Sequence, residues 1–284
     1  MEDLRNKAYD LVDQCKYKEA IECFNEALVA GGDNKEFKTS VIVELGYVYC
    51  ILEQFDLAMD YFREARDFAI QKGKDGQLFD AMMGIGNVKY GQKKFKEALS
   101  IYDIAARIHT SQDNMAYLHR RQALAYIKVG SFDFAKTKLD KAVSNKQPAI
   151  YLARCFRAYG DYEYQAGGNI YNAWINYCDA FLRMVKFRKG SYHDAETCGV
   201  LYDMACLMLQ KKHKDDAMFL LRQVYIVYVR TFGARGHSQV EEVIKLFGDT
   251  VLPTEKNPVP LADVLAIIET VDMRETSCCS CNIQ

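Results

Sequence analysis

Three of the ten cysteines lie close together at the end of the sequence, in the segment S-C-C-S-C-N-I-Q at 277–284. Thiols gathered in this way have three physical uses: metal binding, disulfide formation and lipid attachment. A structural zinc site usually needs four ligands arranged as two spaced pairs, whereas this segment has three thiols and no nearby histidine. A disulfide is disfavoured by the reducing cytosol, where we expect synthesis because M-E-D-L-R-N-K lacks the apolar core of a secretory signal.

Lipid attachment fits the position of these cysteines best. The residues C-N-I-Q at 281–284 match the pattern C-a-a-X, in which a final Gln favours a farnesyl group on Cys281. One prenyl chain alone gives marginal membrane binding, and no polybasic stretch precedes it, so Cys278 and Cys279 are predicted as palmitoylation sites. The segment resembles the dual-lipid tail of some Ras-family proteins. It predicts a prenylated, palmitoylated and carboxyl-methylated chain on a cytosolic membrane face.

Residues with other chemistry are scattered rather than assembled. Gly84, Gly86 and Gly91 form no nucleotide loop, because no strand precedes them and no G-K-[S/T] follows. Nothing brings together a nucleophile, a base and a group to orient them. We therefore predict no catalytic residue, no metal, no cofactor and no small-molecule substrate. The histidines have no H-E-x-x-H spacing and no cysteine partner; they are His109, His119, His193, His213 and His237.

The composition favours a helical protein that does not bind nucleic acid. The 37 basic and 38 acidic residues nearly cancel, whereas a nucleic-acid binder would have a basic surface. Half of the residues are hydrophobic, which supports a continuous core, and no run of eighteen apolar residues occurs. Three of the four prolines lie at Pro253, Pro258 and Pro260, so the chain before them is free to be helical and 249–260 is predicted as a linker.

Internal repetition is the strongest signal in the sequence. Four segments each contain an aromatic residue, an Ala three residues later, a large apolar residue four further on and a second Ala three after that. On a helix the last three positions share one face. The segments are Y-K-E-A-I-E-C-F-N-E-A (17–27), F-D-L-A-M-D-Y-F-R-E-A (55–65), F-K-E-A-L-S-I-Y-D-I-A (95–105) and F-D-F-A-K-T-K-L-D-K-A (132–142).

A second helix, also with a small residue at a fixed place, is predicted before each of these segments. The small residues of the four units are Ala8, Gly46, Gly86 and Ala123. A fifth unit follows with Ala173, Tyr177 and Ala180, and a sixth with Ala205, Ala217 and Leu221. A small residue lets a neighbouring helix approach closely, and a large one fills the gap between helices.

These residues resemble the tetratricopeptide repeat (TPR), and G-N at 86–87 and G-S-Y-H-D-A-E at 190–196 are similar to the Leu-Gly-Asn and kinesin light chain types. The resemblance implies an all-α fold, a right-handed superhelical solenoid of about six TPR helical hairpins with C-terminal capping helices. The array would span 1–240, followed by a capping helix, linker and terminal helix in 241–277 and the lipidation tail in 278–284. The units are expected near 1–34, 39–72, 79–112, 116–149, 154–187 and 198–231.

The resemblance also implies a concave groove that binds a peptide or helix of a partner protein. The second, fifth, ninth and twelfth positions of each unit face such a groove. In this chain they include Arg5, Tyr9, Tyr47, Asn87, Tyr90, Tyr117, Arg120, Tyr162 and Tyr202. Several of the tyrosines are equally suited to packing between helices. A clamp for a C-terminal carboxylate, as in chaperone-binding TPRs, is not expected, because Glu44 lies near its place in the second unit and Met83 and Gly84 in the third.

Two functions remain open from the sequence. In the first, the chain is a non-catalytic scaffold that binds a protein partner in its groove and is held at a membrane by its lipidated cysteines. In the second, it is a soluble cargo or signalling adaptor of the kinesin light chain kind with an unmodified tail. Modification of Cys281 distinguishes the two.

Overall fold

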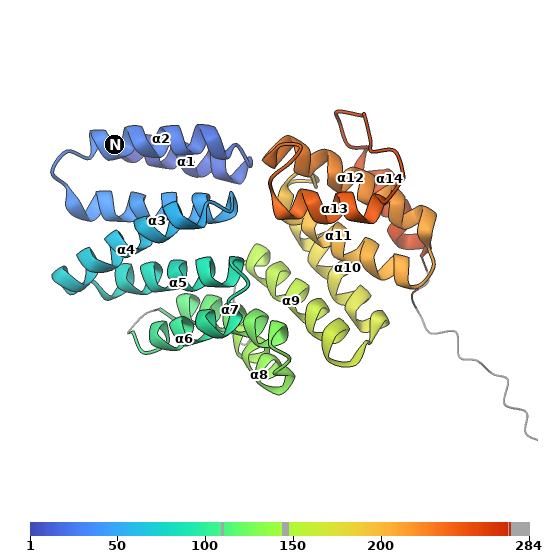
Figure 1. Cartoon of the computed structure of the whole chain (residues 1–284), viewed down its shortest axis with the longest axis horizontal. Helices are drawn as coiled ribbons and strands as arrows, with labels where there is room; N and C mark the ends of the chain where they lie inside the picture. The colour runs from blue at the N-terminus through green and yellow to red at the C-terminus, as the bar shows by residue number, and fades with distance from the viewer. Residues whose placement is uncertain (109–110, 144–147, 272, 274–284) are drawn as a thin grey trace, which may run out of the picture.

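The computed structural model describes residues 1–284 except 109–110, 144–147, 272 and 274–284. The described residues form fourteen α-helices and no strand, and the first twelve pair in sequence order into six hairpins (Figure 1). This confirms the all-helical solenoid of hairpins predicted from the sequence. The hairpins are α1 (Glu2–Asp13) with α2 (Tyr17–Ala30), α3 (Lys35–Ile51) with α4 (Phe55–Lys72), α5 (Asp75–Gly91) with α6 (Phe95–Ala105), α7 (Gln112–Lys128) with α8 (Phe132–Val143), α9 (Ala149–Gly167) with α10 (Ile170–Phe187) and α11 (Ala195–Gln210) with α12 (Lys214–Phe232).

Two further helices follow the hairpins, α13 (Ser238–Phe247) and α14 (Leu261–Thr270). None of the helices in the described part of the chain has the length and apolar character needed to cross a membrane. The seven cysteines that the structure describes are free thiols. The predicted lipidation sites Cys278, Cys279 and Cys281 lie outside the described residues.

Close contacts between small and large residues hold the hairpins together. A Cβ atom added to Gly86 would lie 2.3 Å from the ring of Tyr102, and one added to Gly46 would lie 2.8 Å from the ring of Phe62. The same Phe62 ring also occupies the space beside Gly84, where an added Cβ would lie 2.2 Å away. Phe62 therefore joins the second hairpin to the third, and glycine is required on both sides of it.

The turn inside each hairpin contains one residue in the left-handed region, at nearly the same place in every repeat. Its φ lies between 58° and 77°, and in four of the six turns it is not glycine. These residues are Cys15, Glu53, Lys93, Gly130, Gly168 and Lys212. Left-handed conformations are unfavourable for side chains with a Cβ, so the packing of the two helices sets this turn.

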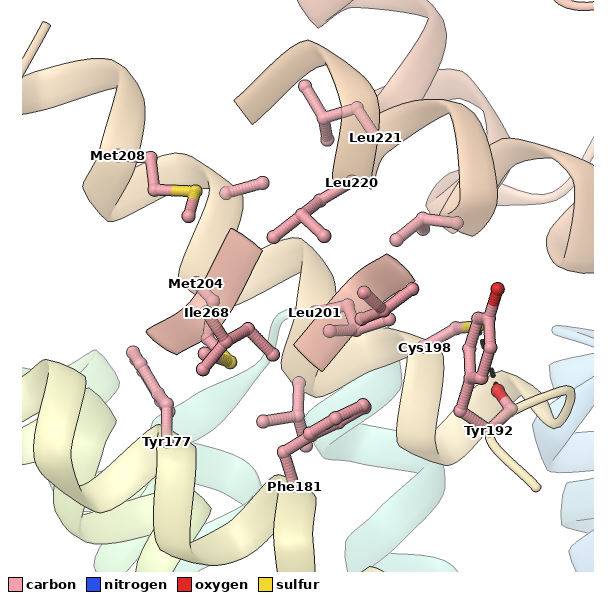
Figure 2. Close-up of a cluster of buried hydrophobic side chains, with 14 of the residues drawn as sticks. Tyr177, Phe181, Tyr192, Cys198, Leu201, Met204, Met208, Leu220, Leu221 and Ile268 are labelled. Atoms are coloured by element: carbon pink, nitrogen blue, oxygen red, sulfur yellow. Dashed lines mark hydrogen bonds between the residues drawn. The ribbon is translucent and has the colours of Figure 1, made fainter. Parts of the chain in front are cut away.

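The last two hairpins and the C-terminal helices share one hydrophobic core. Figure 2 shows side chains such as Phe181, Leu201, Leu221 and Ile268 gathered from α10, α11, α12 and α14. Hydrogen bonds fix the linker before α14 as well: the Tyr192 hydroxyl donates to the carbonyl of Val259 at 2.6 Å. Because α14 covers apolar residues of the hairpins, it ends the solenoid as a cap.

The two ends of the solenoid touch each other at a closing seam, formed by the turn after α1, the end of α3 and the turn after α12 (Figure 1). The ring of Tyr17 stacks on Phe232, with centroids 6.1 Å apart, and Phe232 stacks on His237 at 3.8 Å. His237 Nε2 hydrogen-bonds the backbone carbonyl of Ile51 at 2.9 Å. His237 and Ile51 are 186 positions apart in the sequence and are in direct contact, so the solenoid closes on itself.

Polar contacts complete the closing seam. The backbone N–H of Ser238 donates to the Glu53 carboxylate at 2.9 Å, and the Ser238 hydroxyl donates to the other carboxylate oxygen. On the other side of the seam, Arg188 forms an ion pair with Asp13 at 3.6 Å. These contacts are close to solvent, so each contributes at most about 1 kcal/mol.

We predict that the double variant Phe232→Ala/Glu53→Ala opens the ring, because it removes the stacked aromatic contact and the acceptor for Ser238. Small-angle X-ray scattering should show a larger radius of gyration while the helical circular dichroism signal is unchanged. The matched variant Phe134→Ala/Glu64→Ala changes an exposed Phe and Glu away from the seam and should keep the wild-type radius. Equal radii for all three proteins would show that the seam does not hold the ring closed.

Candidate binding groove

Two adjoining hollows mark the inner surface of the solenoid. The first has a volume of about 560 Å³, and every residue that lines it belongs to the first helix of a hairpin. These residues are Glu44, Tyr47, Cys50, Ile51, Asn87, Tyr117, Arg120, Arg121, Arg154 and Glu196. The second hollow, of about 590 Å³, shares Cys50, Ile51, Asn87 and Arg121 with the first and reaches the start of α13. The first helices therefore form one continuous polar groove, here called the inner groove.

The structure brings five of the predicted groove residues together. Tyr47, Asn87, Tyr117 and Arg120 line the first hollow, and Asn87 and Tyr90 line the second. They come from α3, α5 and α7, which lie next to one another in the solenoid. Partner binding by these residues remains a prediction.

Arg5 and Tyr9 lie on α1 and line neither hollow. The Tyr9 hydroxyl donates to the Glu44 carboxylate at 3.4 Å, which connects α1 to the first hollow. Arg5 donates to the Ser40 hydroxyl at 3.3 Å, and its guanidinium lies over the ring of Phe37. Both side chains therefore join the first hairpin to the second.

Tyr162 and Tyr202 line neither hollow. Tyr162 packs edge-to-face on Phe132 of the preceding hairpin, and Tyr202 packs against the C-terminal core. For Tyr162 the reason is a register error of one residue in the fifth unit. The close contact of Gly160 with Tyr177 is the equivalent of Gly86 with Tyr102, so the unit begins one residue earlier than predicted.

With this register, the groove positions of α9 are Arg154, Arg157 and Asp161. These three residues are not among the predicted groove residues, although the small residue Gly160 before Tyr177 indicates the register that selects them. The Arg154 guanidinium forms two hydrogen bonds to the Glu196 carboxylate, at 2.5 and 2.8 Å. Burial would raise the pKa of Glu196, but hydrogen bonding to Arg154 and its charge hold that pKa below the usual range.

Arg157 lies between two acidic side chains at the border of the inner groove. Its Nε donates to the Asp203 carboxylate at 2.7 Å, and its Nη2 donates to the backbone carbonyl of Gly199 at 3.0 Å. Asp161 accepts a hydrogen bond from Tyr177 at 2.7 Å and also lies within the field of Arg157. Each of these charges therefore has a partner of opposite sign.

Asn87 is the centre of a buried hydrogen-bond network rather than a free groove residue. Its carbonyl oxygen accepts from the Tyr102 hydroxyl at 2.7 Å and from Arg121 Nε at 2.6 Å. Its amide nitrogen donates to the Tyr117 hydroxyl at 2.9 Å. The network joins α5, α6 and α7, so Asn87 and Tyr117 position Arg121 at the wall of the groove.

The N-terminal part of the inner groove contains two carboxylates that are hard to ionise. Burial, with the nearby charge of Asp80, raises the pKa of Glu44 to about 7, and burial raises the pKa of Asp80 to about 6. In the unfolded chain Glu44 ionises near its ordinary value of 4.5. Ionised Glu44 is therefore less favourable in the folded state, and this part of the groove disfavours added negative charge.

From these values we predict that Glu44 lowers stability as the pH rises from about 4.5 to 7, since the folded protein holds the proton longer than the unfolded chain. Glu44→Gln removes this penalty and should raise the free energy of unfolding by about 1–2 kcal/mol at pH 7.5, a value reduced for solvent access. Below pH 4 the variant and the wild type should agree. Urea unfolding at both pH values measures this, and a pH-independent difference would contradict the assignment.

Among the described residues, no group of three or more His, Cys, Asp and Glu side chains is placed to hold a metal ion. What the groove offers is a row of hydrogen-bonding, aromatic and cationic side chains on a fixed helical scaffold. Tyr and Arg are enriched in the parts of protein interfaces that contribute most of the binding energy. The arrangement is suited to recognising an extended or helical segment of another protein.

No protein-family model matches the chain, and no curated protein matches it either. Among solved structures, a tetratricopeptide repeat protein from Parabacteroides merdae is 14% identical and aligns over 94% of this chain and 98% of its own, with a TM-score of 0.46. The TPR2AB domain of yeast Sti1, solved as a complex with pHSP90, is 12% identical over 87% of this chain and 96% of its own, with a TM-score of 0.36. Similarities this weak give no information about what this chain binds.

Proposed function

We propose that the chain is a non-catalytic interaction scaffold, which binds a peptide or helix of a partner protein in the inner groove. The observation that supports this most directly is the first hollow of about 560 Å³, lined only by first helices of five successive hairpins. Helical hairpins placed side by side present such a surface without any movement of the backbone. Binding to a surface formed in advance loses little conformational entropy.

A selection from a library of random 16-residue peptides tests this proposal. Peptides that bind should lose affinity for the variant Tyr47→Ala, whose side chain lines the first hollow. They should bind Phe134→Ala with wild-type affinity, because Phe134 is exposed on α8 outside the hollow. Melting temperatures of both variants, measured in parallel, separate lost binding from lost folding. Failure to select any peptide, or equal binding to both variants, would contradict the proposal.

We propose further that the scaffold is tethered to a cytosolic membrane face by a farnesyl group on Cys281, with palmitoyl groups on Cys278 and Cys279. This part rests on the sequence C-N-I-Q at 281–284 and requires Gln284 to be the last residue in the cell. The intact mass of the chain from eukaryotic cells, with and without a farnesyltransferase inhibitor, tests it. An unmodified mass, or a location that Cys281→Ser does not change, would favour a soluble adaptor instead.

A further inference from the structure

Two neighbouring arginines in the inner groove have no acidic partner within the described part of the chain. Arg120 and Arg121 both line the first hollow, and neither forms an ion pair with any described residue. The next two arginines of the groove differ: Arg154 pairs with Glu196 at 2.5 Å and Arg157 with Asp203 at 2.7 Å. The guanidinium groups on α9 are thus paired with carboxylates, whereas those on α7, the preceding first helix, are not.

Arg121 is held in place by neutral groups only. Its Nε donates to the Asn87 carbonyl oxygen at 2.6 Å and to the Tyr102 hydroxyl at 3.3 Å. Its guanidinium carbon lies 4.8 Å from the centre of the Tyr90 ring, a cation–π contact. These contacts fix the direction of the side chain, but none of them cancels its charge.

Arg120 has an unpaired donor that is buried in the structure. Its Nε is shielded from solvent and has no hydrogen-bond partner among the residues that the structure describes. Its guanidinium carbon lies 5.6 Å from the centre of the Tyr117 ring. Burial and repulsion by Arg121 lower the pKa of Arg120, yet a guanidinium stays protonated in proteins. A shielded charge without a counterion is unfavourable, so the free protein keeps Arg120 at a cost in stability.

We infer that Arg120 and Arg121 bind a carboxylate, supplied by an Asp or Glu side chain within the partner segment that occupies the inner groove. The inference rests on the proposed function and specifies its partner. A carboxylate would accept hydrogen bonds from both guanidinium groups and compensate their charge, and the guanidinium fork matches carboxylate geometry. The arginine pair on α7 is where the first hollow has positive charge without a described carboxylate paired to it. Glu44, at the N-terminal part of the groove, disfavours a second carboxylate there, so we place the acidic position of the segment at α7.

The place of the arginine pair in the fold favours an internal side chain over a chain end. Helix α7 belongs to the fourth of the six hairpins, and the groove continues from it in both directions. Towards the N-terminus it continues to Glu44 and Tyr47, and towards the C-terminus to Arg154 and Glu196. A segment that fills the groove therefore passes the pair with residues on both sides.

Binding measurements with selected peptides test the inference. The probe is the tightest-binding 16-residue peptide from the random library, synthesised with an acetylated N-terminus and an amidated C-terminus. Each Asp and Glu of this peptide is replaced in turn by its amide. The peptides are measured by fluorescence anisotropy against wild type, Arg120→Gln and Arg121→Gln. Arg63→Gln is the control, since this exposed arginine lies on α4, outside the groove.

We expect one acidic residue of the peptide to be essential, with an affinity loss of at least about tenfold when it is replaced by its amide. Arg120→Gln should cause a similar loss, and combining the two changes should add little further loss, because both remove the same contact. Arg63→Gln should bind as the wild type. Arg120→Gln should melt no lower than the wild type, since it removes an unpaired charge.

Three outcomes would overturn the inference while leaving the proposed function intact. These are a bound peptide without an essential acidic residue, full affinity for both Arg120→Gln and Arg121→Gln, and binding that requires a free C-terminal carboxylate. Absence of any peptide binding to the wild type would instead reject the proposed function together with the inference. The two failures are therefore distinguishable in one experiment.

Discussion

Phe62→Ala is expected to lower the free energy of unfolding by about 3–5 kcal/mol, the usual cost of removing a fully buried Phe. The Phe62 side chain is fully buried and fills the space beside both Gly46 and Gly84. Its loss leaves a cavity that the stiff helices on either side cannot close. Because this ring joins two hairpins, the loss should weaken contacts between repeats as well as within one repeat. Urea unfolding followed by circular dichroism measures the change.

Phe134→Ala is the matched control for Phe62→Ala. The same substitution is made on a helix, but Phe134 is 62% exposed on α8 and stacks on the ring of Tyr126. Its cost should stay below about 1 kcal/mol. If the two variants lost the same stability, the packing of large residues against glycines would not be what holds the hairpins together.

Arg157→Met is expected to lower the free energy of unfolding by about 2–4 kcal/mol at pH 7.5, because removing one partner of a shielded ion pair leaves the other uncompensated. Arg157 donates to Asp203 at 2.7 Å. Asp161 also interacts electrostatically with the Arg157 guanidinium. Methionine keeps much of the volume of the side chain, so the effect reports the charge rather than a cavity. Thermal and urea unfolding give the size of the loss.

The loss in Arg157→Met should depend on pH. Burial raises the pKa of Asp203 above its ordinary value even with Arg157 present, and removing the guanidinium raises it further. At pH 5 the variant can therefore protonate Asp203, and the cost should be smaller than at pH 7.5. The double variant Arg157→Met/Asp203→Asn should be more stable at pH 7.5 than Arg157→Met alone. A loss that is equal at both pH values would contradict the ion pair as its cause.

The repeated part of the fold could be predicted because each hairpin uses the same local rule. A small residue on the first helix and a large one on the second recur in the sequence, and the structure places Gly86 against Tyr102 as this rule requires. The fifth hairpin shows where the rule fails. Its spacing from Gly160 to Tyr177 is one residue longer than the spacing from Gly86 to Tyr102. Counting back from Tyr177 with the shorter spacing therefore assigns Tyr162, instead of Asp161, to the groove-facing position.

The closing seam and the charge pairing of the groove could not be predicted, because both depend on residues far apart in the sequence. His237 hydrogen-bonds the carbonyl of Ile51. This contact depends on the sum of the small rotations between successive hairpins, which brings the two ends of the solenoid together. Likewise, Arg120 and Arg154 look alike in the sequence. Only the structure shows that Glu196 reaches Arg154 and that no described carboxylate pairs with Arg120.

The most direct test of the central claim is hydrogen–deuterium exchange of the full chain with and without a selected peptide. If the inner groove binds the partner segment, protection should increase on the first helices α3, α5, α7, α9 and α11, which line the first hollow. The second helices α4, α6, α8 and α10 contribute nothing to that hollow and should exchange at unchanged rates. Protection confined to the second helices would place the binding surface on the outside of the solenoid and contradict the account.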